Sequence, residues 1–206
     1  MLMKTLPVSK AVLLCLWFIF FCLSFTARTQ ELPADNQNLF VTALEKKALH
    51  ELPFKNETLL FFMAYDSSLD INEYSALKNE LTEFAVKLES RKSRFKKDME
   101  YAKFVFDKTH DKYLRHYIKY VPFNQVFHSG DYNCLSGTAL YAYLFERLGF
   151  QVQIFETRYH SFLTITNHSE HEVLIEATDG ENGFINGADK VKSRIEEYQL
   201  NESKLI

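Results

Sequence analysis

The hydrophobic pattern in the last third of the chain constrains the fold more than any other feature. Apolar side chains recur at steps of three and four from 134 to 148, and Gly149 then provides a typical helix C-terminus. Apolar and polar residues alternate from 150 to 156, as in a half-buried strand. Segments rich in β-branched and aromatic residues follow at 160–166 and 172–178. A helix that leads into at least three consecutive antiparallel strands predicts an α+β domain.

The chain before this region is expected to be mainly helical. Apolar residues recur with helical spacing in four segments, residues 39–52, 71–88, 95–106 and 113–120. Asp70, with Glu73 three residues later, has the spacing of a helix start. Residues 58–65 fit either a buried helix or a strand, since the segment is too short for its period to decide. The basic run at 90–97 is interpreted as a solvated turn.

The first 29 residues have the pattern of a secretory signal. Two lysines supply positive charge, and an apolar run at 11–25 is shorter than the roughly 18 residues of a membrane span. We expect cleavage before Gln30, so that the mature protein is secreted or periplasmic and has nothing inserted in a membrane. An uncleaved N-terminal anchor is the alternative.

The rest of the sequence predicts a polar linker, residues 30–38, followed by one domain over residues 39–206. The chain is 47% hydrophobic and 15% aromatic, which is ample for a packed core. Its formal net charge of −3 gives no reason to expect nucleic acid or an anionic membrane surface as a partner. No cofactor is expected, and the oligomeric state is left open.

The distribution of the three cysteines singles out Cys134. Cys15 and Cys22 lie in the apolar run and would be removed with it, which leaves one thiol with no partner for an internal disulfide. Cys134 opens the predicted helix, where the helix dipole and free N–H groups favour a thiolate and can hold an oxyanion. The alternative is a cysteine that only packs in the core.

His160 and Glu176 are the expected companions of Cys134. His160 opens the second predicted strand, and Glu176 lies within the otherwise apolar third strand. A hairpin centred on residue 168 pairs these two residues on one sheet face, where a carboxylate can orient an imidazole. A solvent-facing Glu176 is the alternative, with Asp179 in the following turn as the fallback acid.

Three stretches together resemble the transglutaminase-like superfamily, and most closely a bacterial branch of largely uncharacterised members. They are YNCLSGTALYAYLFERLGF (132–150), YHSFLTI (159–165) and LIEATDG (174–180). The resemblance covers about residues 95–185. It implies a papain-like α+β core in which Cys134 is the nucleophile, His160 the general base and acid, and Glu176 the orienting acid. The family's commoner acid is Asp, so Glu176 departs from its pattern.

The chemistry implied by the resemblance is acyl transfer from an amide through a thioester, as in a peptidase, amidase or transamidase, with a protein or peptide substrate. The alternative is a catalytically inactive binding module of the cell envelope, because a fold does not determine a function. A zinc site is disfavoured, since it needs three protein ligands and the sequence has no second mature cysteine and no close histidine pair.

Other polar residues are expected to have lesser roles. Gln125 is a candidate donor to an oxyanion, and Asn133 is expected to cap the helix that Cys134 opens. Of the remaining histidines, two lie in a polar turn and three have no obvious companions; they are His168 and His171, and His110, His116 and His128. The charged tail from Ala188 has helical character and no sign of a site.

Overall fold

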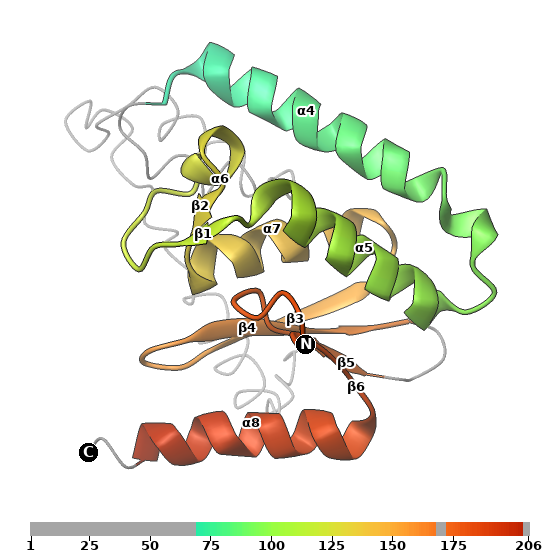
Figure 1. Ribbon diagram of the computed structural model, residues 1–206, viewed down its shortest axis with the longest axis vertical. Helices are drawn as coiled ribbons and strands as arrows, with labels where there is room; N and C mark the ends of the chain where they lie inside the picture. Colours follow the sequence, from blue (N-terminus) through green and yellow to red (C-terminus); the bar gives the residue numbers. More distant parts are fainter. Residues whose placement is uncertain (1–68, 168–171, 204–206) are drawn as a thin grey trace, which may run out of the picture. The chain divides into compact units, whose positions relative to one another are not determined.

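The computed structural model describes residues 69–167 and 172–203. The expected signal, linker and first two segments of the domain lie outside these residues. Within them the α+β prediction is confirmed, because helices precede and flank a four-stranded antiparallel sheet (Figure 1). No helix of the described residues is long and apolar enough to cross a membrane.

The sheet has the strand order β3-β4-β5-β6, with neighbours in the chain also neighbours in the sheet. Its strands are β3 (Gln151–Glu156), β4 (Ser161–Thr166), β5 (Val173–Ile175) and β6 (Phe184–Asn186). The first two agree with the predicted segments, whereas β5 ends earlier than expected. β6 was not predicted. Its three residues follow a turn rich in glycine and acidic residues, and three residues are too few for an alternating pattern to be recognised.

Both faces of the sheet are covered, which explains why β4 is buried along almost its whole length. One face carries Leu163 and Val173 into the main core beneath α7 (Cys134–Arg147). The other face carries Phe162 and Leu174 into a smaller cluster beneath the C-terminal helix α8 (Ala188–Ser203). Figure 1 shows α7 and α8 on opposite sides of the sheet.

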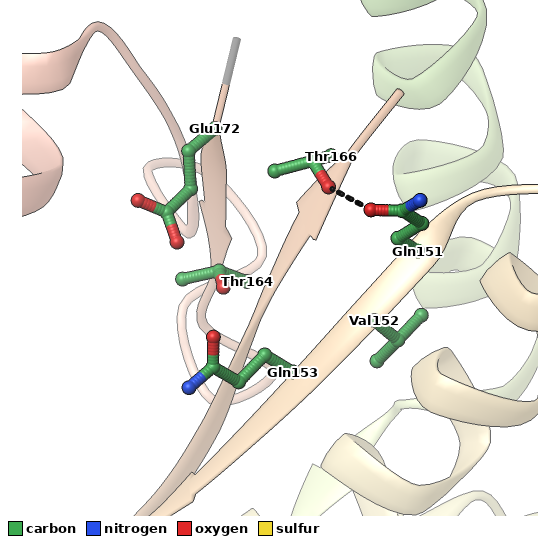
Figure 2. A pocket seen from close by; sticks show the side chains of 6 residues that line it. All are labelled: Gln151, Val152, Gln153, Thr164, Thr166 and Glu172. Carbon is green, nitrogen blue, oxygen red and sulfur yellow. Dashed lines mark hydrogen bonds between the residues drawn. The ribbon is translucent and has the colours of Figure 1, made fainter. Parts of the chain in front are cut away.

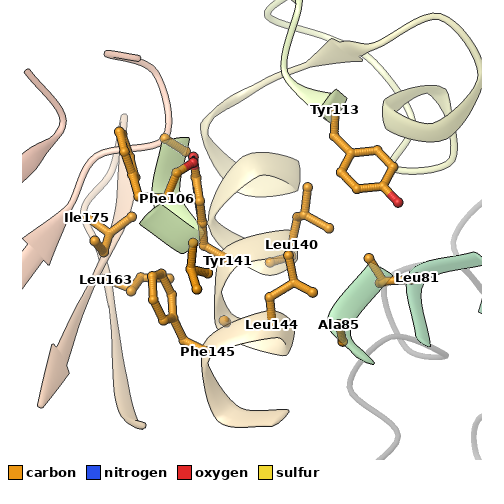
Figure 3. Packing of buried hydrophobic residues seen from close by; sticks show 14 of the residues in the cluster. Leu81, Ala85, Phe106, Tyr113, Leu140, Tyr141, Leu144, Phe145, Leu163 and Ile175 are labelled. Carbon is orange, nitrogen blue, oxygen red and sulfur yellow. The ribbon is translucent and has the colours of Figure 1, made fainter. Parts of the chain in front are cut away.

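The core helix α7 packs between the sheet and the N-terminal helices. Leu140, Leu144 and Phe145 are fully buried, and Figure 3 shows them among the side chains that surround α7. The buried Tyr141 hydroxyl donates to the carbonyl oxygen of Phe106 at 3.0 Å, which connects α7 to α5 (Asp98–Tyr113). The predicted helix end is also correct, since Gly149 has a φ of 89° that suits glycine.

Helix α4 (Ile71–Glu89) begins where the sequence predicts. The Asp70 side chain accepts hydrogen bonds from the N–H groups of Asn72 and Glu73, which satisfies two of the unpaired donors of the first turn. Tyr74, Leu77, Leu81, Ala85 and Leu88 form its buried face. Ile71, which was expected on that face, is 37% exposed.

The predicted helix at 113–120 is wrong. Helix α5 ends at Tyr113, and the short strand β1 (His116–Tyr117) pairs in parallel with β2 (Asp131–Tyr132). The reason is a long-range partner, since the N–H groups of Arg115 and His116 both donate to the carbonyl of Gly130. The following short helix α6 (Gln125–His128) returns the chain to β2, directly before α7.

Candidate active site

Cys134 is the first residue of α7 and is half-buried. Asn133 precedes it as the predicted cap, because its side chain accepts from the N–H of Ser136 at 2.8 Å and the Ser136 hydroxyl accepts from the N–H of Asn133 at 2.9 Å. This capping box fixes the first turn of α7. The thiol therefore lies at the positive end of a well-formed helix.

His160 immediately precedes β4 and is held by the turn that joins β3 to β4. The Thr157 hydroxyl accepts from the N–H of His160 and donates to its carbonyl oxygen, both at 3.1 Å. The N–H of Thr157 donates to the same carbonyl at 2.8 Å. On the side of α7, the Thr138 hydroxyl donates to the carbonyl of Ser161 at 3.0 Å, which connects the helix to the start of β4.

Glu176 follows β5 directly and has both carboxylate oxygens engaged. Its side chain is 3% exposed. His160 Nε2 and the Tyr198 hydroxyl each lie 2.6 Å from Oε2. Oε1 accepts from the Thr178 hydroxyl at 2.7 Å and from its N–H at 3.2 Å. A buried carboxylate is costly unless it is paired and hydrogen-bonded, and here it is both.

The predicted hairpin register is wrong by two residues, yet the predicted contact forms. Leu163 pairs with Ile175 at the end of the ladder, which centres the hairpin on residue 169; continued by one residue, this register sets Glu176 opposite Phe162. A shift of two residues in the partner preserves the sheet face, because side chains alternate with a period of two. Glu176 is therefore a diagonal neighbour of His160 instead of its direct partner, and its side chain reaches across.

The turn after Glu176 has little room for side chains. The N–H of Gly183 donates to the carbonyl of Asp179 at 2.7 Å, and the N–H of Glu176 donates to that of Gly183 at 2.8 Å. A β-carbon at Gly183 would clash with the carbonyl oxygens of Glu176 and Asp179. In α7, a β-carbon at Gly137 would lie 2.7 Å from that of Ala177. These two glycines allow the turn to close and α7 to approach it.

The electrostatics favour a thiolate–imidazolium pair. A hydrogen bond with His160 is the largest influence on Cys134 and lowers the pKa of its thiol, against the opposing effect of burial. Hydrogen bonds with Cys134 and Glu176 raise the pKa of His160 to about 9. Burial alone would raise the pKa of Glu176, but the hydrogen bonds from His160 and Tyr198 outweigh it and lower the pKa. Each of the three shifts favours the charged form of its group, a thiolate for Cys134, an imidazolium for His160 and a carboxylate for Glu176.

Tyr198 is the site residue that the sequence reasoning missed. It comes from α8, in the tail that was interpreted as having no sign of a site. Besides its bond to Glu176, its ring lies 5.1 Å from the His160 ring and 4.8 Å from that of Phe162. The available signal was the helical spacing of Val191, Ile195 and Tyr198, which marks a face that packs on the sheet.

The other predicted candidates lie elsewhere. The Asp179 carboxylate accepts from the N–H of Asn182 at 2.8 Å and takes no part in the hydrogen bonds of the site. Gln125 begins α6, and within the described residues its side chain forms no hydrogen bond to the three candidates. Two of the histidines do have companions, in the pairs His116–Asp131 (3.2 Å) and His128–Glu73 (2.9 Å); His168 and His171 fall outside the described residues.

Neither a metal site of the described residues nor the cavity along β3 and β4 involves these three residues. Across residues 69–167 and 172–203, no group of three His, Cys, Asp or Glu residues is arranged to hold a metal ion. A cavity of about 180 Å³ opens further along β3 and β4, lined by Gln151, Val152, Gln153, Thr164, Thr166 and Glu172 (Figure 2). It contains none of the three candidate residues.

A thiol, an imidazole and a carboxylate therefore come from three elements to the same end of the sheet, where β4 begins and β5 ends. Glu176 holds Nε2 of His160, which leaves Nδ1 for the thiol. This order of groups suits a nucleophile, a general base and an orienting acid. Comparison with known protein families, curated proteins and solved structures finds no match for this chain.

Proposed function

We propose that the chain is an exported cysteine-dependent enzyme that transfers the acyl group of an amide through a thioester, as a peptidase, amidase or transamidase. The observation that carries the proposal is the hydrogen bond between His160 and Glu176, together with a Cys134 at the N-terminus of α7 whose thiol pKa is lowered chiefly by His160. The order of these groups along the chain also supports membership of the transglutaminase-like superfamily. The apolar run near the N-terminus supports export.

The proposed reaction has two steps. The Cys134 thiolate attacks the carbonyl carbon of the amide, and the C–N bond breaks as His160 Nδ1 gives its proton to the leaving amine. A thioester on Cys134 remains. Water or a second amine then attacks the thioester, gives a proton to His160 and releases the acyl group as an acid or a new amide. Glu176 keeps the imidazole oriented in both steps.

The tetrahedral intermediates carry a negative oxygen that needs hydrogen-bond donors. In the first turn of α7, Asn133 engages the N–H groups of Ser136 and Gly137. The N–H of Cys134 makes no hydrogen bond within the described residues. This N–H therefore supplies one donor, strengthened by the helix dipole.

Acetyl transfer from p-nitrophenyl acetate to the full-length protein tests the proposal without knowledge of the natural substrate. We expect a burst of p-nitrophenolate and an acetyl adduct on Cys134, detected by mass spectrometry. The His160→Ala variant should lose the adduct, whereas His116→Ala, which removes an exposed histidine, should keep it. An unmodified Cys134 with the alkylation rate of an ordinary free thiol would contradict the proposal and favour the binding module.

A further inference from the structure

We propose that the substrate is a peptide with a bulky apolar or aromatic side chain on the acyl side of the cleaved amide. The side chain would bind an apolar rim at the site, formed by Tyr117, Ile118, Tyr120, Leu135 and Tyr159. The inference rests on the proposed function. The amine leaves in the first step, whereas the acyl part remains at Cys134 until the second step releases it, so apolar contacts beside Cys134 can act on the acyl part in both steps.

Exposed apolar side chains are concentrated at the rim. Nine large apolar side chains are exposed among the described residues, and five of them form the rim. Their exposed fractions run from 42% for Ile118 to 84% for Tyr120. Single exposed apolar residues are ordinary on a protein surface, whereas a group of them marks a binding site.

The chain connects each rim residue to the nucleophile or to the base. Leu135 follows Cys134, and Tyr159 precedes His160. Tyr117 pairs with Tyr132 in the parallel strands, with ring centroids 5.8 Å apart, two residues before Cys134.

The cap of α7 holds the remaining part of the rim. The side-chain amide of Asn133 donates to the carbonyl oxygens of Lys119 and Val121, both at 3.3 Å. These bonds fix the backbone on each side of Tyr120. The N–H of Ile118 donates to the carbonyl of Tyr132 at 2.7 Å. The rim is therefore attached to the same residues that position the thiol.

The side chains of the rim favour a peptide over a sugar. Tyrosine rings stack on either ligand, but Ile118 and Leu135 offer neither a ring nor a hydrogen-bonding group and suit an apolar side chain. The hydroxyls of Tyr117 and Tyr159 can donate to peptide carbonyls next to that side chain. A surface of apolar bodies with polar tips is typical of peptide and protein recognition.

Two chloromethyl ketones test the inference on the full-length protein, one of N-acetylphenylalanine and one of N-acetylglycine. For each variant, the rate at which each probe alkylates Cys134 is divided by the rate of alkylation by iodoacetamide. We expect the normalised rate of the phenylalanine probe to exceed that of the glycine probe at least about tenfold, as apolar pockets discriminate by size. This phenylalanine-to-glycine ratio should fall towards one in Leu135→Ser and in Tyr159→Ser. Val86→Ser, a matched control on α4 that is 53% exposed, should keep it.

The outcomes separate this inference from the proposed function. If the phenylalanine-to-glycine ratio of the wild type is near one while Cys134 still reacts rapidly with iodoacetamide, the proposed substrate class is wrong and the proposed enzyme activity still stands. Slow reaction with iodoacetamide overturns both. A concentration-dependent dimer that Leu135→Ser dissociates, seen by sedimentation, would assign the rim to a second copy of the chain and overturn the inference.

Discussion

Replacing Glu176 by glutamine removes a negative charge and keeps the length of the side chain. The Gln oxygen can still accept from His160 and Tyr198, while the amide can donate to the Thr178 hydroxyl but cannot accept from the Thr178 N–H. The main loss is the negative charge on the acceptor of the 2.6 Å hydrogen bond to His160 Nε2. Such bonds contribute about 1.5–3 kcal/mol, equivalent to about 1–2 pKa units. We therefore expect the pKa of His160 to fall from about 9 to about 7–8.

The consequence is measurable at Cys134. A less basic His160 is less often protonated, so it stabilises the thiolate less and the pKa of Cys134 rises. In an iodoacetamide alkylation profile between about pH 5 and 10, the acidic limb reports formation of the thiolate. We expect Glu176→Gln to move this limb up by about one pH unit. Glu181→Gln, which changes an exposed carboxylate in the same turn, should leave it in place. Coincident profiles for the wild type and Glu176→Gln would refute the reasoning.

Three further substitutions test how the site is supported. Tyr198→Phe removes a donor to a buried carboxylate, and chemical denaturation should show a loss of about 1.5–3 kcal/mol in the free energy of unfolding. Gly183→Ala forces a methyl group against two carbonyl oxygens, so the melting temperature should fall, with a cost of about 1–3 kcal/mol. Asn133→Ala removes the cap of α7 and should cost about 0.5–2 kcal/mol; an unchanged denaturation midpoint in any of the three would contradict its stated role.

The parts of the fold that the sequence predicts are those set by local patterns. The helix that Cys134 opens and the strands β3 and β4 carry periodicities that few alternatives fit, and Asn133 and Gly149 mark the ends of that helix. The segment after Tyr113 was mistaken for helix because its composition suits one. Its backbone pairs instead with Gly130 and Tyr132, which lie more than ten residues further along the chain.

The candidate site was predictable only in part, for the same reason. Residue type and order along the chain single out Cys134, His160 and Glu176. The hairpin register was displaced because the turn length had to be assumed. Tyr198 contacts Glu176 from 22 residues away, through a helix on the far face of the sheet. Cys134 is on α7, which covers one face of the sheet, whereas Tyr198 is on α8, which covers the other. No spacing of residues in the sequence predicts that these two helices contribute to the same site.

The displaced register gives a physical reason for a glutamate where the resembling family more often has aspartate. Glu176 lies opposite Phe162 and must reach His160 along the diagonal. Aspartate is shorter by one carbon–carbon bond, about 1.5 Å, and cannot keep 2.6 Å contacts to both His160 and Tyr198. Glu176→Asp should therefore move the acidic limb of the alkylation profile upwards as the glutamine variant does, although it keeps the charge. If the aspartate variant retained the wild-type profile, charge alone would orient His160, and the reach of the side chain would not be the reason for glutamate.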